Sequence, residues 1–272
     1  MFAQQDADRI LRFYNSPATA AQYARARYIT ACERLLFDRY IEPGASILDV
    51  GVGGGRTSEY LARGASRYVG IDYAAEMIQI CRRKYPEWEY VAGSVTDLSR
   101  FQDGSFDAVV MPYNVVDDVI PAQNRRRCFK ECYRVLRSGG YLIFSSHNPR
   151  AIFARPDWDA ARSRVAAKRA VPGGVGRLAF RISEICALAS AAFLAIKTSA
   201  FWILRYSVQA PFWRGEGHML DSEGLMTHFW IPKKVIAELT QFSFRLMDMQ
   251  GDDYPRKSRA LMTGWYYYVF AK

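Results

Sequence analysis

Cysteine is scarce in this chain, and its cysteines are not arranged in pairs. There are five Cys among 272 residues, and no two of them form a CxxC pair. This spacing excludes a disulfide framework, and the odd number is typical of a protein from a reducing compartment. The five are Cys32, Cys81, Cys128, Cys132 and Cys186.

A long apolar run and a signal peptide are also lacking. The most apolar stretch, residues 182–204, contains Glu184 and Lys197, so its uncharged part is shorter than the ~20 residues that cross a bilayer. The first ten residues, MFAQQDADRI, have no basic region followed by an apolar core. We therefore expect a cytoplasmic protein without a cleaved leader.

The composition is that of a folded protein with an excess of positive charge. Hydrophobic residues make up 50% of the chain and charged residues 24%, which excludes a disordered or collagen-like protein. Lys and Arg number 37 against 27 Asp and Glu, a net charge of +10. This excess favours an anionic partner but does not identify one. The length suits one elaborated α/β domain.

Strand-like and helix-like segments alternate between about residues 45 and 146, which predicts a parallel sheet. Ahead of the first strand, residues 18–40 have the pattern of one amphipathic helix. The predicted strands are 46–50, 67–72, 88–92, 106–111 and 141–145, followed in the tail by 244–249 and 264–270. The predicted helices are 56–63, 75–85, 122–136 and 232–241.

The composition changes after residue 149. Eight Lys or Arg stand against two Asp between residues 150 and 181, and an aromatic stretch follows at 201–206. A minimal α/β core contains no such segment. We therefore expect a core over residues 1–149, a helical insertion or lid that contributes to acceptor binding over 150–225, and completion of the core sheet by 226–272.

The most specific motif is ILDVGVGGGR at residues 47–56. It is an apolar strand that contains Asp49 and runs into four glycines, where a backbone turns sharply and exposes its amides to a ligand. Arg56 stands where a dinucleotide fingerprint would require its third Gly. Asp72 ends the next strand, 21 residues after Gly51, where a carboxylate accepts hydrogen bonds from ribose hydroxyls. Together these residues indicate an adenosine-containing cofactor.

With these motifs, residues 10–148 and 227–272 resemble the class I S-adenosylmethionine-dependent methyltransferases. The resemblance implies an enzyme with a Rossmann-like, seven-stranded, mostly parallel sheet flanked by helices, and with S-adenosylmethionine as its cofactor. The family's glycine loop maps onto Asp49, Gly51, Gly53 and Gly55, and its ribose-binding acid maps onto Asp72.

Further cofactor contacts are expected from three other places in the chain. The resemblance places Ser94 and Val95 at the adenine, although Ser94 stands where relatives have an acid and accepts a weaker hydrogen bond. Tyr14, ahead of the first strand, either covers the methionine end of the cofactor or packs in the core. Tyr113, just after the fourth strand, is the remaining candidate.

The acceptor site is expected at the carboxyl ends of the fourth and fifth strands, where open α/β sheets bind ligands. His147 is the candidate general base; a core hydrogen-bonding role is the alternative. Asn114 and Asp117 are candidate acceptor contacts, as are His218 and His228 near the end of the insertion. The adjacent acids Asp117 and Asp118 are interpreted as helix caps, and no metal site is predicted.

These residues favour O-methylation of a small-molecule, sugar or lipid-linked acceptor. Nucleic-acid methylation is the first alternative, but Met111 stands where base-amino methyltransferases carry Asn or Asp, and no Pro precedes a Cys. A non-catalytic scaffold protein is the second alternative, and the intact Asp49 and Asp72 argue against it. The basic insertion further suggests peripheral contact with an anionic membrane.

Overall fold

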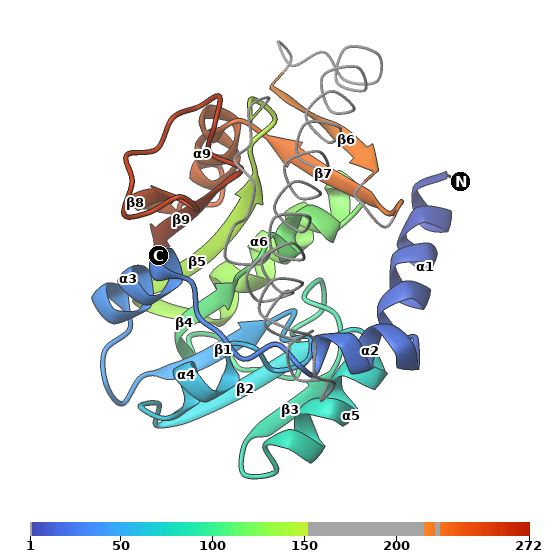
Figure 1. Cartoon of the computed structure of the whole chain (residues 1–272). Coiled ribbons are helices and arrows are strands. Elements are labelled where there is room, and N and C mark those ends of the chain that lie inside the picture. The colour runs from blue at the N-terminus through green and yellow to red at the C-terminus, as the bar shows by residue number, and fades with distance from the viewer. Residues whose placement is uncertain (1, 152–214, 221–223) are drawn as a thin grey trace, which may run out of the picture.

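A seven-stranded sheet forms the centre of the computed structural model, which describes residues 2–151, 215–220 and 224–272 (Figure 1). The strand order across this sheet is β3-β2-β1-β4-β5-β9-β8. Its strands are β1 (Ser46–Val50), β2 (Arg67–Asp72), β3 (Glu89–Ala92), β4 (Phe106–Met111), β5 (Leu136–His147), β8 (Arg245–Gly251) and β9 (Trp265–Ala271).

The sheet is mostly parallel, as the sequence predicts. β1 pairs in parallel with β2 and β4, and the same direction continues to β3 and β5. β9 is inserted antiparallel between β5 and β8. The carboxyl ends of β1, β2, β4 and β5 therefore meet at one edge, and the site is built there.

Helices cover both faces of the sheet. One hydrophobic cluster joins α3, α4 and α5 to the sheet, and a second joins α6 and α9 to its other face. The helices are α1 (Phe2–Tyr14), α2 (Pro17–Tyr23), α3 (Ala31–Tyr40), α4 (Ser58–Ala62), α5 (Ala75–Lys84), α6 (Ala122–Val135) and α9 (Pro232–Thr240), with a 3₁₀ helix η1 (Val115–Asp118). This three-layer packing is the predicted architecture.

The segment before β1 differs from the prediction, because residues 18–40 form two helices rather than one. Ser16 caps α2, and Pro17 occupies its first position. Thr30 starts α3 through a capping box with Glu33, which gives the chain a new helix start inside the amphipathic pattern. The extended residues between the helices let the backbone of Tyr23 lie against Gly54.

Two further elements differ from the prediction. β5 begins at Leu136, directly after α6, whereas the predicted strand begins only at residue 141. Residues 226–230 do not join the main sheet: β7 (Met226–Trp230) pairs with β6 (Glu216–Leu220) in a separate hairpin, and β7 packs against η1 and β5. Most of the expected lid, 152–214 and 221–223, lies outside the described residues.

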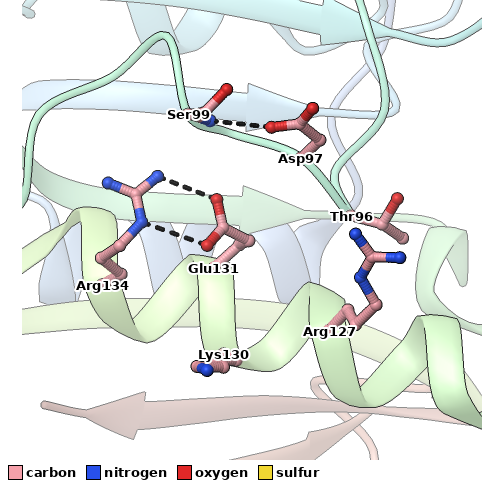
Figure 2. Close-up of a pocket in the computed structure, with 7 residues that line it drawn as sticks. All are labelled: Thr96, Asp97, Ser99, Arg127, Lys130, Glu131 and Arg134. Carbon is pink, nitrogen blue, oxygen red and sulfur yellow. Dashed lines mark hydrogen bonds and ion pairs between the residues drawn. The ribbon is translucent and has the colours of Figure 1, made fainter.

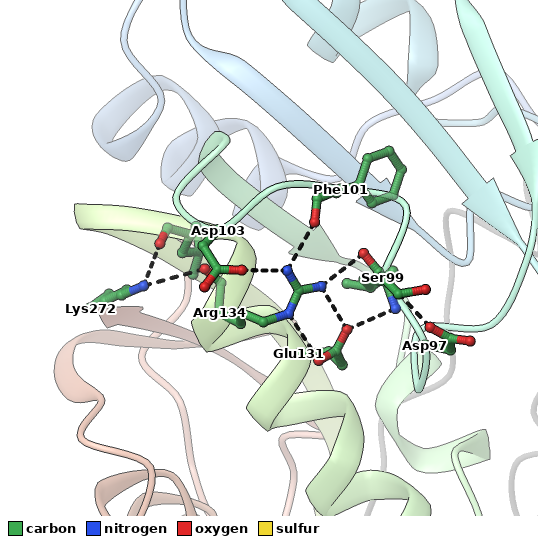
Figure 3. Close-up of polar contacts among 9 residues, drawn as sticks. Asp97, Ser99, Phe101, Asp103, Glu131, Arg134 and Lys272 are labelled. Carbon is green, nitrogen blue, oxygen red and sulfur yellow. Dashed lines mark hydrogen bonds and ion pairs between the residues drawn. The ribbon is translucent and has the colours of Figure 1, made fainter.

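Away from the carboxyl edge, the connection between β3 and β4 is fastened to α6 by Arg134 (Figure 3). Its guanidinium forms ion pairs with Glu131 and Asp103 and donates to the carbonyls of Leu98 and Phe101. Nearby, Lys272 donates to the carbonyl of Leu136 at 2.6 Å. These contacts join the β3–β4 connection to α6 and the last residue to the start of β5, although these segments are distant in the sequence.

A buried ion pair joins α3 to the end of the glycine loop. Arg56 donates to both carboxylate oxygens of Glu33, at 2.7 and 2.5 Å, and Tyr267 of β9 donates to the same carboxylate. Glu33 is fully buried. The pair thus ties a helix, the central sheet and the cofactor loop together.

Loss of this buried ion pair should destabilise the protein much more than loss of an exposed ion pair. We expect Glu33→Ala to lower the free energy of unfolding by about 3–5 kcal/mol, because it leaves the Arg56 charge buried without its partner. Glu59→Ala, which removes the exposed partner of Arg63, should cost less than about 1 kcal/mol. Urea titration followed by circular dichroism measures both, and equal losses would contradict the assigned importance of Glu33.

Candidate active site

The glycine loop leaves β1 in a conformation that side chains resist. Gly51, Gly53 and Gly55 have φ values of +66°, +53° and +75°, the left-handed region that favours glycine. A Cβ on Gly54 would lie 2.4 Å from the carbonyl oxygen of Tyr23, so no larger residue fits there. The loop therefore has its sharp turn because of its glycines.

Asp72 at the end of β2 is tied to this loop. Its Oδ2 accepts the amide of Gly53 at 2.9 Å, and its Oδ1 accepts the amide of Ala74 at 2.9 Å. Burial raises its pKa to about 6, although these amide hydrogen bonds act in the opposite direction. Each carboxylate oxygen retains a second lone pair, so Asp72 can still accept two vicinal ribose hydroxyls.

Asp49 lies beneath the loop and is fully buried. Its Oδ2 accepts the hydroxyls of Thr57 at 2.6 Å and Tyr68 at 2.8 Å, whereas its Oδ1 has no partner. Burial raises its pKa to about 6, against the effect of these two hydroxyls. A buried carboxylate oxygen without a partner is costly, and a cationic ligand lowers that cost. The acids and the glycine loop therefore fit an adenosine cofactor with a positively charged methionine end.

The other predicted cofactor residues occupy neighbouring segments. Val95 is part of the buried core. Ser94 is exposed, and its Oγ accepts the amide of Thr96 at 3.2 Å. The hydroxyl of Tyr14 donates to Asp118 at 3.2 Å, and its ring meets Tyr23 edge-on at 5.7 Å.

Two residues just after β4, at the carboxyl edge of the sheet, have a strained backbone conformation. Tyr113 and Asn114 have φ values of +60° and +64°, which cost non-glycine residues of order 1 kcal/mol each. The amide of Asn114 donates to Ser145 at 2.7 Å, and its side-chain Nδ2 lies 3.2 Å from Nε2 of His147. The half-exposed ring of Tyr113 packs against Trp265 at 5.7 Å.

His147, at the end of β5, is paired with Asp117 of η1. Its Nδ1 lies 2.8 Å from Asp117 Oδ2, and its backbone amide donates to the same oxygen at 2.8 Å. Asp117 is fully buried. With Nδ1 as donor to this carboxylate and Nε2 as acceptor from Asn114, the ring is held in one tautomer. The structure thus brings together three predicted site residues, with Asp117 beside His147 rather than exposed to an acceptor.

Two residues that the sequence analysis missed hold Asp117 from its other side. Ser146 donates to Asp117 Oδ1 at 2.5 Å, and Trp230 of β7 donates from Nε1 to Ser146 Oγ at 2.7 Å. The only signal in the sequence is the run of polar residues Ser145 to His147 at the end of an apolar strand. Nothing local relates Trp230 to it.

The remaining candidates lie on the hairpin. His218 and His228 are directly opposed on β6 and β7, with ring centroids 5.0 Å apart. His228 is fully buried against Trp230, and burial together with Arg125 lowers its pKa to about 2, so it is neutral. In this structure His228 is therefore a buried residue that packs against Trp230 rather than an exposed acceptor contact.

Other kinds of site receive no support from the described residues. Within residues 2–151, 215–220 and 224–272, no group of three or more His, Cys, Asp or Glu gathers to hold a metal ion. No helix in these ranges is long and apolar enough to cross a membrane. A surface pocket beside α6, shown in Figure 2, contains none of the predicted site residues. It is lined by Thr96, Asp97, Ser99, Arg127, Lys130, Glu131 and Arg134.

Comparisons with known proteins agree with this geometry. Residues 48–144 match a family described as a methyltransferase domain. The chain is 34% identical over 139 residues to the ubiquinone biosynthesis O-methyltransferase of Xanthomonas campestris pv. campestris, which covers 48% of this chain and 52% of that protein. It is 33% identical over 101 residues to the demethylmenaquinone methyltransferase of Renibacterium salmoninarum, covering 37% and 40% of the two proteins. The chain thus spans about half of the curated relatives it matches.

Solved structures share the fold over most of the chain. An S-adenosylmethionine-dependent methyltransferase from Methanosarcina mazei has a TM-score of 0.57 at 20% identity, covering 87% of this chain and 96% of that one. The 1,6-didemethyltoxoflavin-N1-methyltransferase of Burkholderia thailandensis has a TM-score of 0.56 at 12% identity, covering 98% and 87%. Residues 48–144 thus resemble a methyltransferase domain, and the glycine loop and strand order of this chain belong to the fold that these solved structures share.

Proposed function

We propose that the protein transfers the methyl group of S-adenosylmethionine to a hydroxyl group of a small-molecule acceptor. The observation that carries this proposal is the His147–Asp117 pair at the ends of β5 and η1, beside the glycine loop. An amine acceptor needs only to be neutral, whereas a hydroxyl benefits from a base that removes its proton. A histidine oriented by a buried carboxylate supplies such a base.

The residues divide the work of methyl transfer between them. S-adenosylmethionine supplies an electrophilic methyl group, and Asp72 and the glycine loop hold its ribose and methionine ends. The acceptor hydroxyl displaces the Asn114 amide from Nε2 of His147, and the freed lone pair accepts the hydroxyl proton. Asp117 holds the ring in this orientation and stabilises the imidazolium that forms. Because the displacement is in line, most of the catalytic effect comes from alignment and exclusion of water.

A planar aromatic acceptor suits the surroundings of His147. The rings of Tyr113 and Trp265 lie 5.7 Å apart, and Trp265 is 6.3 Å from the His147 ring. The aromatic side chains of Tyr113 and Trp265 favour offset or edge-on packing of a flat acceptor ring. The names of two relatives refer to ubiquinone biosynthesis and demethylmenaquinone, which supports a quinone-like or phenolic acceptor over a sugar.

Nucleic acid remains the competing acceptor because the chain carries a net charge of +10. Radiolabelled methyl transfer to a panel of hydroxylated benzoquinone precursors, simple sugars and total RNA separates these classes. We expect label on the phenolic compounds. Label on RNA alone would replace the small-molecule proposal with the alternative.

The cofactor assignment predicts that Asp72→Ala binds S-adenosylmethionine at least tenfold more weakly than wild type. Loss of a charge-assisted contact to the ribose is worth about 1.5–3 kcal/mol, and the glycine loop also loses its anchor. Isothermal titration calorimetry measures the affinity. Asp38→Asn, at an exposed acid on α3, is the control and should bind normally. Equal affinities for all three proteins would remove Asp72 from the site.

The assignment of the base predicts that His147→Ala lowers kcat about 10²–10⁴-fold and leaves the cofactor affinity unchanged. Asp117→Asn should also lower kcat, because an amide cannot stabilise the imidazolium and can bind the other tautomer. Turnover of His147→Ala equal to that of wild type would return His147 to a structural role.

Binding of the basic insertion to membranes stays a prediction, because that segment lies outside the described residues. If it brings the enzyme to a lipid-linked acceptor, the protein should float with vesicles that contain anionic phosphatidylglycerol at low salt and be released at high salt. Flotation with neutral phosphatidylcholine vesicles is the control. Absence of binding to the anionic vesicles would contradict the membrane hypothesis.

A further inference from the structure

A second acid beside Asp117 has no part in the proposed proton transfer. Asp118 ends η1, and its Oδ2 accepts the hydroxyl of Tyr14 from α1 at 3.2 Å. The buried Thr227 of β7 also hydrogen-bonds to it. Two separate elements, α1 and β7, therefore hold this carboxylate of η1 in place.

The groups around Asp118 also border the cofactor loop. Tyr14 packs against Tyr23, and a Cβ on Gly53 would lie 3.5 Å from the ring of Tyr23. Tyr14 also packs against the cluster of Ala20, Ala74 and Met77, and Ala74 lies two residues beyond Asp72. Asp118 is thus joined through Tyr14 to both parts of the cofactor site, the glycine loop and the turn after β2.

Val115, at the start of the same 3₁₀ helix, packs on the loop from the other side. A Cβ on Gly51 would lie 2.6 Å from its methyl carbons. Tyr73 provides another link, since burial and the charges of Asp118 and Asp72 all raise its pKa. The carboxylates of Asp118 and Asp72 therefore both lie near the side chain of Tyr73.

The electrostatics around Asp118 disfavour a negative charge while the site holds no cation. Burial, together with the charge of Asp117, raises the pKa of Asp118 to about 7, against the opposing effects of Thr227, His147 and Tyr14. The pKa of Asp72 is also raised, to about 6, by burial. The acids Asp49, Asp72, Asp117 and Asp118 all belong to this carboxyl edge, and its surroundings stabilise an added positive charge.

We propose that Asp118, held by Tyr14, is the counter-charge that lets the site bind the cationic sulfonium cofactor in preference to its neutral thioether product. This inference rests on the proposed use of S-adenosylmethionine. Methyl transfer converts the sulfonium into a thioether and so removes one positive charge. Asp118 then takes up a proton from solvent, and the attraction that favoured the cofactor over the product is lost.

The test is the ratio of the affinities for S-adenosylmethionine and S-adenosylhomocysteine, measured by calorimetry at pH 6 and pH 8. Both ligands carry the same ribose and amino-acid groups, so hydrogen bonds to these groups contribute alike to both affinities. The charges of Asp49 and Asp72 act on the sulfonium as well, and Asp118→Asn separates their contribution from that of Asp118. For wild type we expect the preference for S-adenosylmethionine to increase up to about tenfold between pH 6 and pH 8, as Asp118 loses its proton.

Two variants assign the effect to this side chain. Asp118→Asn should remove the part of this change that Asp118 contributes, so that the ratio varies less with pH than in wild type. Tyr14→Phe removes a donor that stabilises the carboxylate, so the midpoint of the wild-type change should move to higher pH. Glu238→Gln, at an acid paired with Arg126 on α9, is the control and should behave as wild type.

The outcomes separate this inference from the proposed function. If wild type binds both ligands with a ratio that does not change with pH, or if Asp118→Asn retains the wild-type change, the counter-charge role is wrong while the cofactor assignment stands. If folded wild type binds neither ligand, the cofactor assignment itself is overturned. A change with pH that is smaller only in Asp118→Asn and displaced in Tyr14→Phe supports the inference.

Discussion

The buried carboxylate of Asp117 is the constraint on which the arrangement of this site depends. A carboxylate removed from water is stable only when hydrogen-bond donors replace its hydration. Ser146 and the backbone and ring of His147 supply those donors, and all of them come from β5. Satisfying one charge therefore joins the turn after β4 to the end of β5 and orients the ring of His147 at the same time.

The acids at the carboxyl edge contrast with the basic character of the whole chain. The net charge is +10, yet Asp49, Asp72, Asp117 and Asp118 follow or end neighbouring elements of the sheet. Such a local reversal of charge suits a cationic cofactor, because the field at a buried site depends on nearby groups much more than on distant, screened ones.

Strand positions were largely predictable from the sequence because each central strand is a short apolar run bounded by turn residues. β1, β2 and β4 have the expected bounds. The segment 18–40 was mispredicted because its apolar spacing continues through Thr30, where the capping box with Glu33 starts a new helix. The β6–β7 hairpin was also missed, because it is short and follows a segment of unusual composition.

The sequence by itself determined the class of fold, the glycine loop and the acids at the ends of β1 and β2, since these depend on local spacing along single strands and turns. It also placed His147 at the correct strand end. Only the tertiary structure decided that Asp117 would contact His147 and that Ser146 and Trp230 would hold that pair. It alone also joined Tyr14 to Asp118. These contacts join residues far apart in the chain, and their formation depends on how the sheet, η1 and the hairpin pack together rather than on any local pattern.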